Sequence, residues 1–190
     1  MSYSKEINTL PVWKKEFLPA FWLFRTVIAE HIRNFNLPFN AREAMQGIES
    51  HIDTVDFTDE RIVHLRGWIR TYKGQDKSLY VGIYTTLHGQ GRGYASVGFP
   101  APDANFTATL IPYNHDGSDF LLSSQYREAS YAGSYLTKAQ NGKLDVLRIQ
   151  SFEETIRIFV EHGALYAEHQ FFFAGVNFLI LNYSMRHKIV

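Results

Sequence analysis

The sequence predicts a mainly β protein, an antiparallel meander closed into a β-barrel of about eight to ten strands, with two N-terminal α-helices packed on it. Three observations predict this fold class. Apolar residues recur at helical spacing up to about residue 52 and alternate with polar residues from there to the C-terminus. Short turns that contain glycine separate the alternating runs. Aromatic residues, which favour sheets, are abundant, with 15 Phe, 11 Tyr and 3 Trp among 190 residues.

Length and charge narrow the class of protein. A chain of 190 residues has the size of one ordinary domain, so we expect a single domain over 1–190, with a helical region over 12–52 and a barrel over 61–190. The 19 basic and 19 acidic residues cancel, which removes any strong overall attraction for nucleic acid. The chain has no cysteine, and its N-terminus has no apolar run typical of a secretory signal. We therefore expect a cytoplasmic protein.

The first predicted helix follows a short lead-in and ends near Asn34. Pro19 suits the first turn of such a helix, because the missing N–H of proline would have no partner there. The segment from Asn36 to Pro38 then stops the helix. The residues that would share its apolar face are Trp13, Phe17, Ala20, Phe21, Phe24, Val27, Ile28, Ile32 and Phe35.

A second helix is predicted from Asn40 to about His51. Asn40 suits the N-cap, and Glu43 stands three residues later, as in a capping box. The residues that would share its apolar face are Ala44, Met45, Ile48 and Ile52. Beyond Asp53 the helical spacing ends, which marks the boundary between the helical region and the strands.

The alternating runs predict roughly nine or ten strands with short connections. Asn141-Gly142 indicates a tight hairpin turn, because both central residues of a type I′ turn need positive φ. His162-Gly163 and Gly175 indicate two further turns. The predicted strands are 61–71, 78–88, 94–99, 106–111, 120–126, 131–139, 144–150, 154–161, 164–174 and 176–187.

The stretch HQFFFAGVNFLILNYSM, residues 169–185, contains no Asp, Glu, Lys or Arg. It is shorter than the roughly 20 apolar residues of a membrane helix and is interrupted by polar residues and by Gly175. We therefore predict two adjacent strands. On the first of them His169 shares an apolar face with Leu165, Ala167, Phe171 and Phe173.

His169 is the main candidate for chemistry. A histidine among apolar neighbours is usually a core residue satisfied by one hydrogen bond. In an apolar cavity, however, a neutral imidazole can also accept or donate a proton near neutral pH. Tyr183 and Glu168 are further candidates for an acid or base. The spacing of histidines and acidic residues matches no metal motif, so we expect no metal and no cofactor.

Part of the chain resembles the lipocalin-like, calycin-type barrels. The resemblance covers Arg61 to Val190 and depends on Gly67-Trp68 in an early strand, the meander that follows, and Arg186 at the end of the last strand. In that superfamily an arginine typically packs across the tryptophan of the first strand. The resemblance implies a cavity for a small lipophilic molecule, and some barrels of this shape are isomerases or cyclases.

These observations lead us to expect a binding protein for a small lipophilic or aromatic molecule. An enzyme that transfers a proton in the same cavity, as an isomerase, cyclase or lyase, is the first alternative, and a homodimeric interaction protein without ligand is the second. We expect no nucleic-acid partner and no membrane partner. The candidate catalytic residues are His169, Tyr183 and Glu168. The candidate ligand-binding residues are Trp68, Tyr80, Tyr84, Tyr94, Tyr135, Phe171, Phe173, Asn182 and Arg186.

Overall fold

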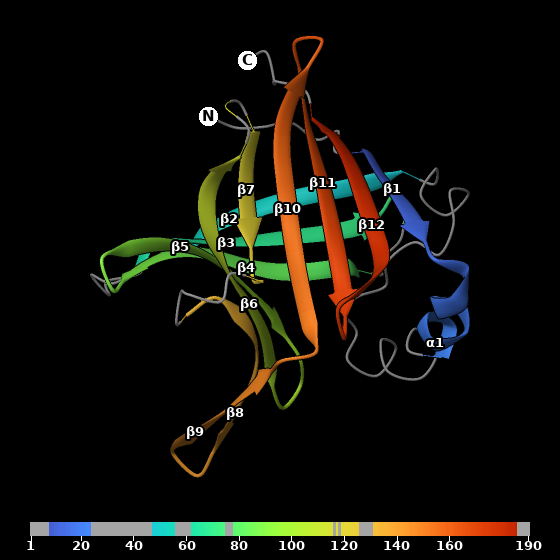
Figure 1. The fold of residues 1–190 in the computed structure, drawn as a ribbon. Helices are drawn as coiled ribbons and strands as arrows, with labels where there is room; N and C mark the ends of the chain where they lie inside the picture. Colours follow the sequence, from blue (N-terminus) through green and yellow to red (C-terminus); the bar gives the residue numbers. More distant parts are fainter. Residues whose placement is uncertain are drawn as a thin grey trace.

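The computed structural model describes residues 8–23, 47–55, 62–74, 78–115, 117, 119–125 and 131–185 (Figure 1). The described chain is mainly β, as predicted, and it forms one sheet of 12 antiparallel strands. The strands are β1 (Asn8–Trp13), β2 (Ile48–Val55), β3 (Ile62–Tyr72), β4 (Ser78–Gly89), β5 (Arg92–Pro100), β6 (Asn105–His115), β7 (Asp119–Ser123), β8 (Gly133–Gln140), β9 (Lys143–Ile149), β10 (Phe152–Glu161), β11 (Ala164–Phe173) and β12 (Val176–Met185).

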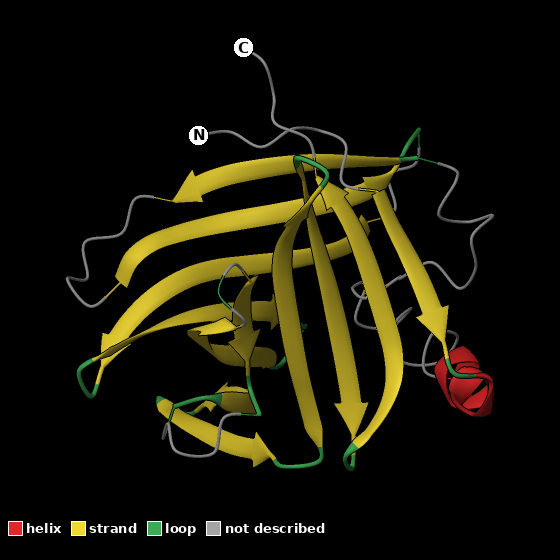
Figure 2. Cartoon of the chain, turned by 45° about the horizontal axis from the view of Figure 1, so that its top comes forward, coloured by secondary structure: helices red, strands yellow, loops and turns green. Residues whose placement is uncertain are grey.

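The sheet is strongly curved but does not close. Its strands follow the order β1-β12-β11-β10-β7-β6-β5-β4-β3-β2, which is a meander in which β1 has joined the far end beside β12. Strands β2 to β4 cross behind β10 to β12 instead of running alongside them (Figures 1 and 2). In the described chain no pairing joins the end strands β1 and β2. The prediction of an antiparallel meander is confirmed, whereas the predicted closed barrel is not formed.

Strand β6 joins the two halves of the sheet. Its first part, Asn105 to Leu110, pairs with β5, and its last part, Ile111 to His115, pairs with β7. The hairpin of β8 and β9 also pairs with the first part of β6 and extends away from the rest of the sheet (Figure 1). One strand therefore belongs to both halves, and the concave side of the sheet lies between them.

The prediction of the first helix is wrong at its beginning. Trp13 is the last residue of β1 and pairs with Leu179 of β12. A 3₁₀ turn, Lys15–Phe17, and a short helix α1, Leu18–Leu23, follow. Pro19 lies in the first turn of α1, as expected. The rest of the predicted helix, residues 24–34, lies outside the described residues.

The prediction of the second helix is wrong at its end. Residues 48–52 belong to β2, which pairs with β3 along its whole length, and the earlier part of this predicted helix lies outside the described residues. The physical reason is that a spacing of four residues keeps Ile48 and Ile52 on one face of a strand as well as on one face of a helix. Pairing with β3, with Ile52 opposite Trp68, decides between the two.

The predicted tight turns are confirmed. Asn141 and Gly142 have φ angles of 53° and 72°, and His162 and Gly163 have φ angles of 50° and 76°. Positive φ at both central residues is what a two-residue hairpin needs. These turns fix the register of β8 with β9 and of β10 with β11. The register in turn decides which side chains reach the concave face.

Candidate functional site on the concave face

Two ladders bring polar residues to the concave face of the sheet. On β3 and β4, Arg70 pairs with Tyr80, and Tyr84 lies on the same face four pairs further along. On β10 and β11, Glu154 pairs with Phe171, next to the pair of Ile156 and His169. Paired residues of an antiparallel ladder point to the same face. We call Arg70, Tyr80, Tyr84, Glu154, His169 and Tyr183 the polar cluster.

Tyr183 of β12 lies near residues of both halves of the sheet. Burial raises its pKa, Tyr80 of one half and Glu154 of the other raise it further, and the Arg70 charge lowers it. Tyr84 of β4 likewise interacts with Tyr183 and Glu154. The polar cluster is therefore one site that spans both halves, and not two separate sets of residues.

The shortest polar contact in the cluster joins His169 and Glu154. Nε2 of His169 lies 2.5 Å from Oε2 of Glu154, and the two side chains are 14% and 5% exposed. A carboxylate can only accept hydrogen bonds, so Nε2 carries the proton when Glu154 is ionised. This leaves Nδ1 as an acceptor in the neutral imidazole. No described residue makes a hydrogen bond to Nδ1.

The backbone of Glu154 is fixed by Ser124, which follows β7. The N–H of Glu154 donates to Oγ of Ser124 at 2.8 Å, and the N–H of Ser124 donates to the carbonyl oxygen of Glu154 at 3.0 Å. Both residues are buried. These two hydrogen bonds fix the backbone of Glu154, and this backbone positions the carboxylate next to His169.

The tyrosines of the cluster are held as neutral phenols. Burial raises the pKa of Tyr84 well above its usual value, and the nearby Tyr80, Tyr183 and Glu154 raise it further. Burial also raises the pKa of Tyr183 and of Tyr80, although the Arg70 charge partly offsets both shifts. The hydroxyls of Tyr80 and Tyr84 lie 3.2 Å apart. All three groups can therefore donate a hydrogen bond at neutral pH.

Arg70 supplies the positive charge of the cluster and is only 2% exposed. Its guanidinium carbon lies 5.3 Å from the ring centroid of Trp68 and 5.7 Å from that of Tyr80. Both distances are within the range of cation–π attraction. The aromatic rings thus stabilise a buried charge that would otherwise be costly.

Six aromatic residues surround the polar cluster, and we call them the aromatic wall. Phe152 is central, with ring centroids 5.5 Å from Phe106, 6.1 Å from Phe171 and 6.2 Å from Phe178. Each of the six is half-buried, so the concave face keeps apolar surface that reaches solvent. The aromatic wall consists of Trp68, Phe99, Phe106, Phe152, Phe171 and Phe178.

Trp68 has an unmatched donor. Its ring lies 5.8 Å from the ring of Tyr80 and 5.7 Å from that of Tyr84. Its Nε1 is buried and has no hydrogen-bond partner within the described part of the chain. A buried N–H without a partner costs about 1–3 kcal/mol. An acceptor from a bound molecule would remove this cost.

Several predicted site residues come together here. His169, Tyr183, Tyr80 and Tyr84 belong to the polar cluster, and Trp68 and Phe171 belong to the aromatic wall. The ring centroid of His169 lies 4.0 Å from that of Phe171 and 6.5 Å from that of Tyr183. The alternation of β11 predicted that His169 and Phe171 share a face, and the register agrees.

Other predicted site residues lie elsewhere. Glu168 pairs with Asn182 on the other face of the sheet, and Oε1 of Glu168 accepts a hydrogen bond from Gln170 at 2.6 Å. Neighbouring residues of a strand point to opposite faces, so Glu168 cannot reach the His169 side. Phe173 ends β11 at a turn and is 51% exposed.

The tyrosines of β5 and β8 are also remote from the cluster. Tyr94 pairs with Leu87 on the opposite face from Tyr84, where it packs with Ile111 and Ala132. The hydroxyl of Tyr135 donates to the carbonyl oxygen of Tyr131 at 3.0 Å. Arg186 lies outside the described residues, so its predicted packing across Trp68 stays a prediction.

Glu154 and Arg70 belong to the site but are not among its predicted residues. A signal for Glu154 was present, because it lies at even spacing between Phe152 and Ile156, on the apolar face of its strand. The signal for Arg70 was weaker. Arg66 lies on the same face of β3 but is exposed, so an arginine at that spacing does not by itself indicate a buried charge. A charged residue at a position where strand alternation predicts an apolar one therefore indicates such a site.

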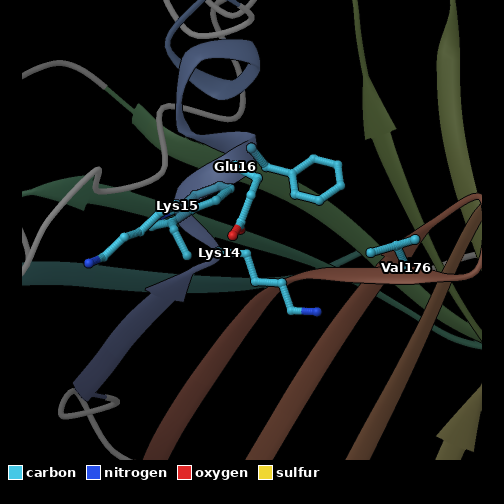
Figure 3. A pocket seen from close by; sticks show the side chains of 6 residues that line it. Lys14, Lys15, Glu16 and Val176 are labelled. Carbon is cyan, nitrogen blue, oxygen red and sulfur yellow. The ribbon is translucent and has the colours of Figure 1, made fainter.

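Two pockets on the surface are separate from the polar cluster. One, of about 510 Å³, is lined by residues that follow β1 and by Val176 at the start of β12 (Figure 3). The other, of about 530 Å³, is lined by Arg92, Gly93 and part of β6. Within the described ranges, no three His, Asp or Glu side chains are grouped to hold a metal ion.

The chain is similar to a longer bacterial protein. The uncharacterized membrane protein YndJ of Bacillus subtilis (strain 168) is 31% identical to the chain over an alignment of 189 residues that covers 95% of the chain. The chain spans only about a third (32%) of the length of this relative. No protein family model matches, and no solved structure matches.

These findings correct two expectations. The expected cytoplasmic location is wrong, because a relative over almost the whole chain is named a membrane protein. No solved structure or family supports the lipocalin-like assignment. In the part of the chain that the structure describes, no helix is both long and apolar enough to cross a membrane.

Proposed function

We propose that this chain binds a small molecule with a flat aromatic or lipophilic body on the concave face of its sheet. The observation that carries the proposal is the polar cluster, in which buried Arg70 and Glu154 and half-buried His169 lie among half-buried aromatic rings. Binding sites for small molecules are typically apolar and concave, with a few polar groups that fix the orientation of the ligand. The aromatic wall supplies the first feature and the polar cluster the second.

A purely structural role explains this arrangement less well. Taking charged groups out of water costs free energy, and apolar residues of similar size would stabilise a core at least as well. The outer face of the same sheet shows such a packing, with Tyr94, Ile111 and Ala132. Charged residues on the concave face are therefore better explained by recognition of a ligand.

The membrane relative suggests where such binding occurs. The matching region is about a third of a protein that is named a membrane protein. We propose that this chain likewise works in association with a membrane. A membrane holds lipophilic molecules at high local concentration, and a domain beside it could take its ligand from there.

A second candidate function is acid–base catalysis on the bound molecule. The short contact of Glu154 with His169 favours it, because a carboxylate that holds Nε2 orients the imidazole and stabilises its protonated form. An enzyme of this kind would move a proton of its substrate, as an isomerase, cyclase or lyase does. A carrier would return its ligand unchanged, whereas an enzyme would convert it, and His169→Gln would abolish that conversion.

The first experiment is native mass spectrometry of freshly purified protein, followed by thermal unfolding with a panel of aromatic and lipophilic compounds. We expect a co-purified molecule, or a compound that raises Tm by about 5–10 °C when its concentration is about 100 times its Kd.

Phe171→Ala and Phe173→Ala make a matched pair, because the two residues lie two positions apart on β11 and only Phe171 belongs to the aromatic wall. Affinity should fall at least about tenfold in Phe171→Ala and stay unchanged in Phe173→Ala. Phe171→Leu, which keeps more volume, checks that a loss does not come from unfolding. Protein that is empty after purification and that no compound stabilises would contradict the proposal.

A further inference from the structure

Three polar groups on the concave face, from His169, Trp68 and Tyr183, can still form hydrogen bonds with a ligand. Nδ1 of His169 is an acceptor when Nε2 donates to Glu154. Nε1 of Trp68 is only a donor, and it is buried without a partner in the described chain. The hydroxyl of Tyr183 can donate and accept. A matching ligand therefore needs one group that both donates and accepts a hydrogen bond.

From this pattern, and resting on the proposed function, we propose that the ligand is a flat compound with a weakly acidic hydroxyl, a phenol or an enol. Its O–H donates to Nδ1 of His169, and its oxygen accepts from Tyr183 or Trp68. The aromatic wall contacts the ring or conjugated system of the ligand. Glu154 is the positioning residue, because it acts on the ligand through His169.

The charges of the cluster argue against a ligand with a permanent charge. Arg70 and Glu154 carry opposite charges, and together they sum to zero when His169 is neutral. A carboxylate ligand would have no proton to give to Nδ1 and would place a second anion near Glu154. An ammonium ligand would leave the donors of Trp68 and Tyr183 unmatched. A neutral hydroxyl avoids both costs.

The same geometry permits transfer of the hydroxyl proton. The O–H bond of the ligand breaks, an N–H bond forms at Nδ1 of His169, and the electron pair stays on the ligand oxygen. The resulting imidazolium lies between the Glu154 carboxylate and the new oxyanion, so its charge is balanced on both sides. Arg70 and the hydroxyls of Tyr80, Tyr84 and Tyr183 belong to the same cluster, and a positive charge and hydroxyl donors near the ligand would favour the oxyanion.

The test compares para-nitrophenol with para-nitroanisole, its methyl ether, which has the same ring but no hydroxyl proton. Calorimetric titration of the wild-type chain should show that the phenol binds about tenfold more tightly than the ether, the effect of one or two hydrogen bonds. The absorbance of the bound phenol should shift toward that of its anion at a pH where the free phenol is mostly neutral.

Variants assign the effect to the dyad of Glu154 and His169. In His169→Gln and in Glu154→Gln the preference for the phenol should fall to less than about threefold. Glu168→Gln, next to His169 but on the other face of the sheet, should keep the preference. Circular dichroism verifies the fold of each variant, and the wild-type comparison of phenol with ether needs no variant.

The outcomes separate the two proposals. Equal affinity for phenol and ether would overturn this inference and leave the proposed function standing. A preference for the phenol that survives both dyad variants would also overturn it, because the hydroxyl would then be recognised elsewhere. Absence of binding by either probe up to millimolar concentration would overturn the inference and count against the proposed function as well.

Discussion

Two groups of tyrosines lie on opposite faces of the β4–β5 ladder, and only one of them surrounds charge. On the concave face Tyr80 and Tyr84 lie with Arg70 and Glu154. On the outer face the ring centroids of Tyr94 and Tyr131 lie 5.5 Å apart, and Tyr94 packs against apolar residues. Residues of one type thus fill a core on one face and build a polar site on the other. The buried charge, and not the tyrosine, marks the site.

Glycines make room for both groups. A Cβ atom at Gly82 would lie 2.9 Å from Cε2 of Tyr84 and 3.3 Å from Cε2 of Tyr80. A Cβ atom at Gly89 would collide with the ring of Tyr131. Glycine at these two positions, which has no side chain, therefore lets tyrosine rings lie against the backbone of the sheet.

The largest effect is expected on the outer face. Tyr94 is 2% exposed, and Tyr94→Ala should lower the free energy of unfolding by about 3–5 kcal/mol, because it leaves a cavity in a close-packed cluster. The affinity for a ligand of the concave face should stay unchanged at temperatures where the variant is folded. Urea unfolding gives the first quantity and calorimetry the second. A loss below about 1 kcal/mol would show that the outer tyrosines do not form a core.

The next largest effect on stability is expected to distinguish Glu154 from Glu168, which lie on opposite faces of the β10–β11 ladder. Glu154→Gln should destabilise the chain by about 1.5–3 kcal/mol, because it weakens a buried hydrogen bond that involves a charge. Glu168→Gln, whose carboxylate bonds only to Gln170 among the described residues, should cost less than about 1 kcal/mol. Urea unfolding of both variants at pH 7 measures the difference. Equal losses of unfolding free energy in the two variants would show that Glu154 is no more important for stability than Glu168.

A smaller effect is expected from Gly82→Ala. The new methyl group would displace the rings of Tyr80 and Tyr84, which should cost about 1–3 kcal/mol and weaken ligand binding. Gly67→Ala is the control, because nothing lies within 4 Å of a Cβ atom there. Gly89→Ala should also destabilise the chain, through Tyr131, but should leave binding unchanged. Binding that survives Gly82→Ala would place the ligand away from these rings.

The smallest effect concerns pH. The folded pKa values of Tyr80, Tyr84 and Tyr183 are raised, so their contribution to stability is fully present below the unfolded value of about 10 and is lost as pH rises above it. Each such tyrosine adds up to about 1.4 kcal/mol per pH unit to this loss. Tyr84→Phe should therefore flatten the dependence of stability on pH between about 10 and 11. An unchanged slope would show that Tyr84 ionises normally in the folded chain.

Much of the concave face could be predicted from the sequence, because strand alternation is strict. Because side chains alternate between the faces of a strand, the sequence predicted that His169 and Phe171 share one face of β11. The tight turn at Asn141-Gly142 was predicted because these residue types tolerate positive φ. The pairing of β10 with β7, by contrast, depends on contacts between distant segments. It was this pairing that brought Ser124 to Glu154.

The N-terminal part shows why local spacing can mislead. Ile48 and Ile52 satisfy helical and strand periodicity equally well, and only the long-range pairing with β3 selects the strand. Trp13 likewise takes its strand conformation from β12, which lies far away in the sequence. Glu168 is a predicted site residue and a sequence neighbour of His169, but alternation places it on the opposite face, whereas Glu154 of the neighbouring strand lies on the same face as His169.

Strand β6 mechanically couples the interior of the molecule to its exterior. Phe106, near its beginning, touches Phe152 of the aromatic wall, and Ile111, further along, belongs to the cluster around Tyr94. A guest that pushes the two halves apart must bend this shared strand, and the bend would change the edge-to-face contact of Tyr94 with Tyr131 on the far side. A spectroscopic probe introduced beside that remote pair would then report occupancy without any label in the site.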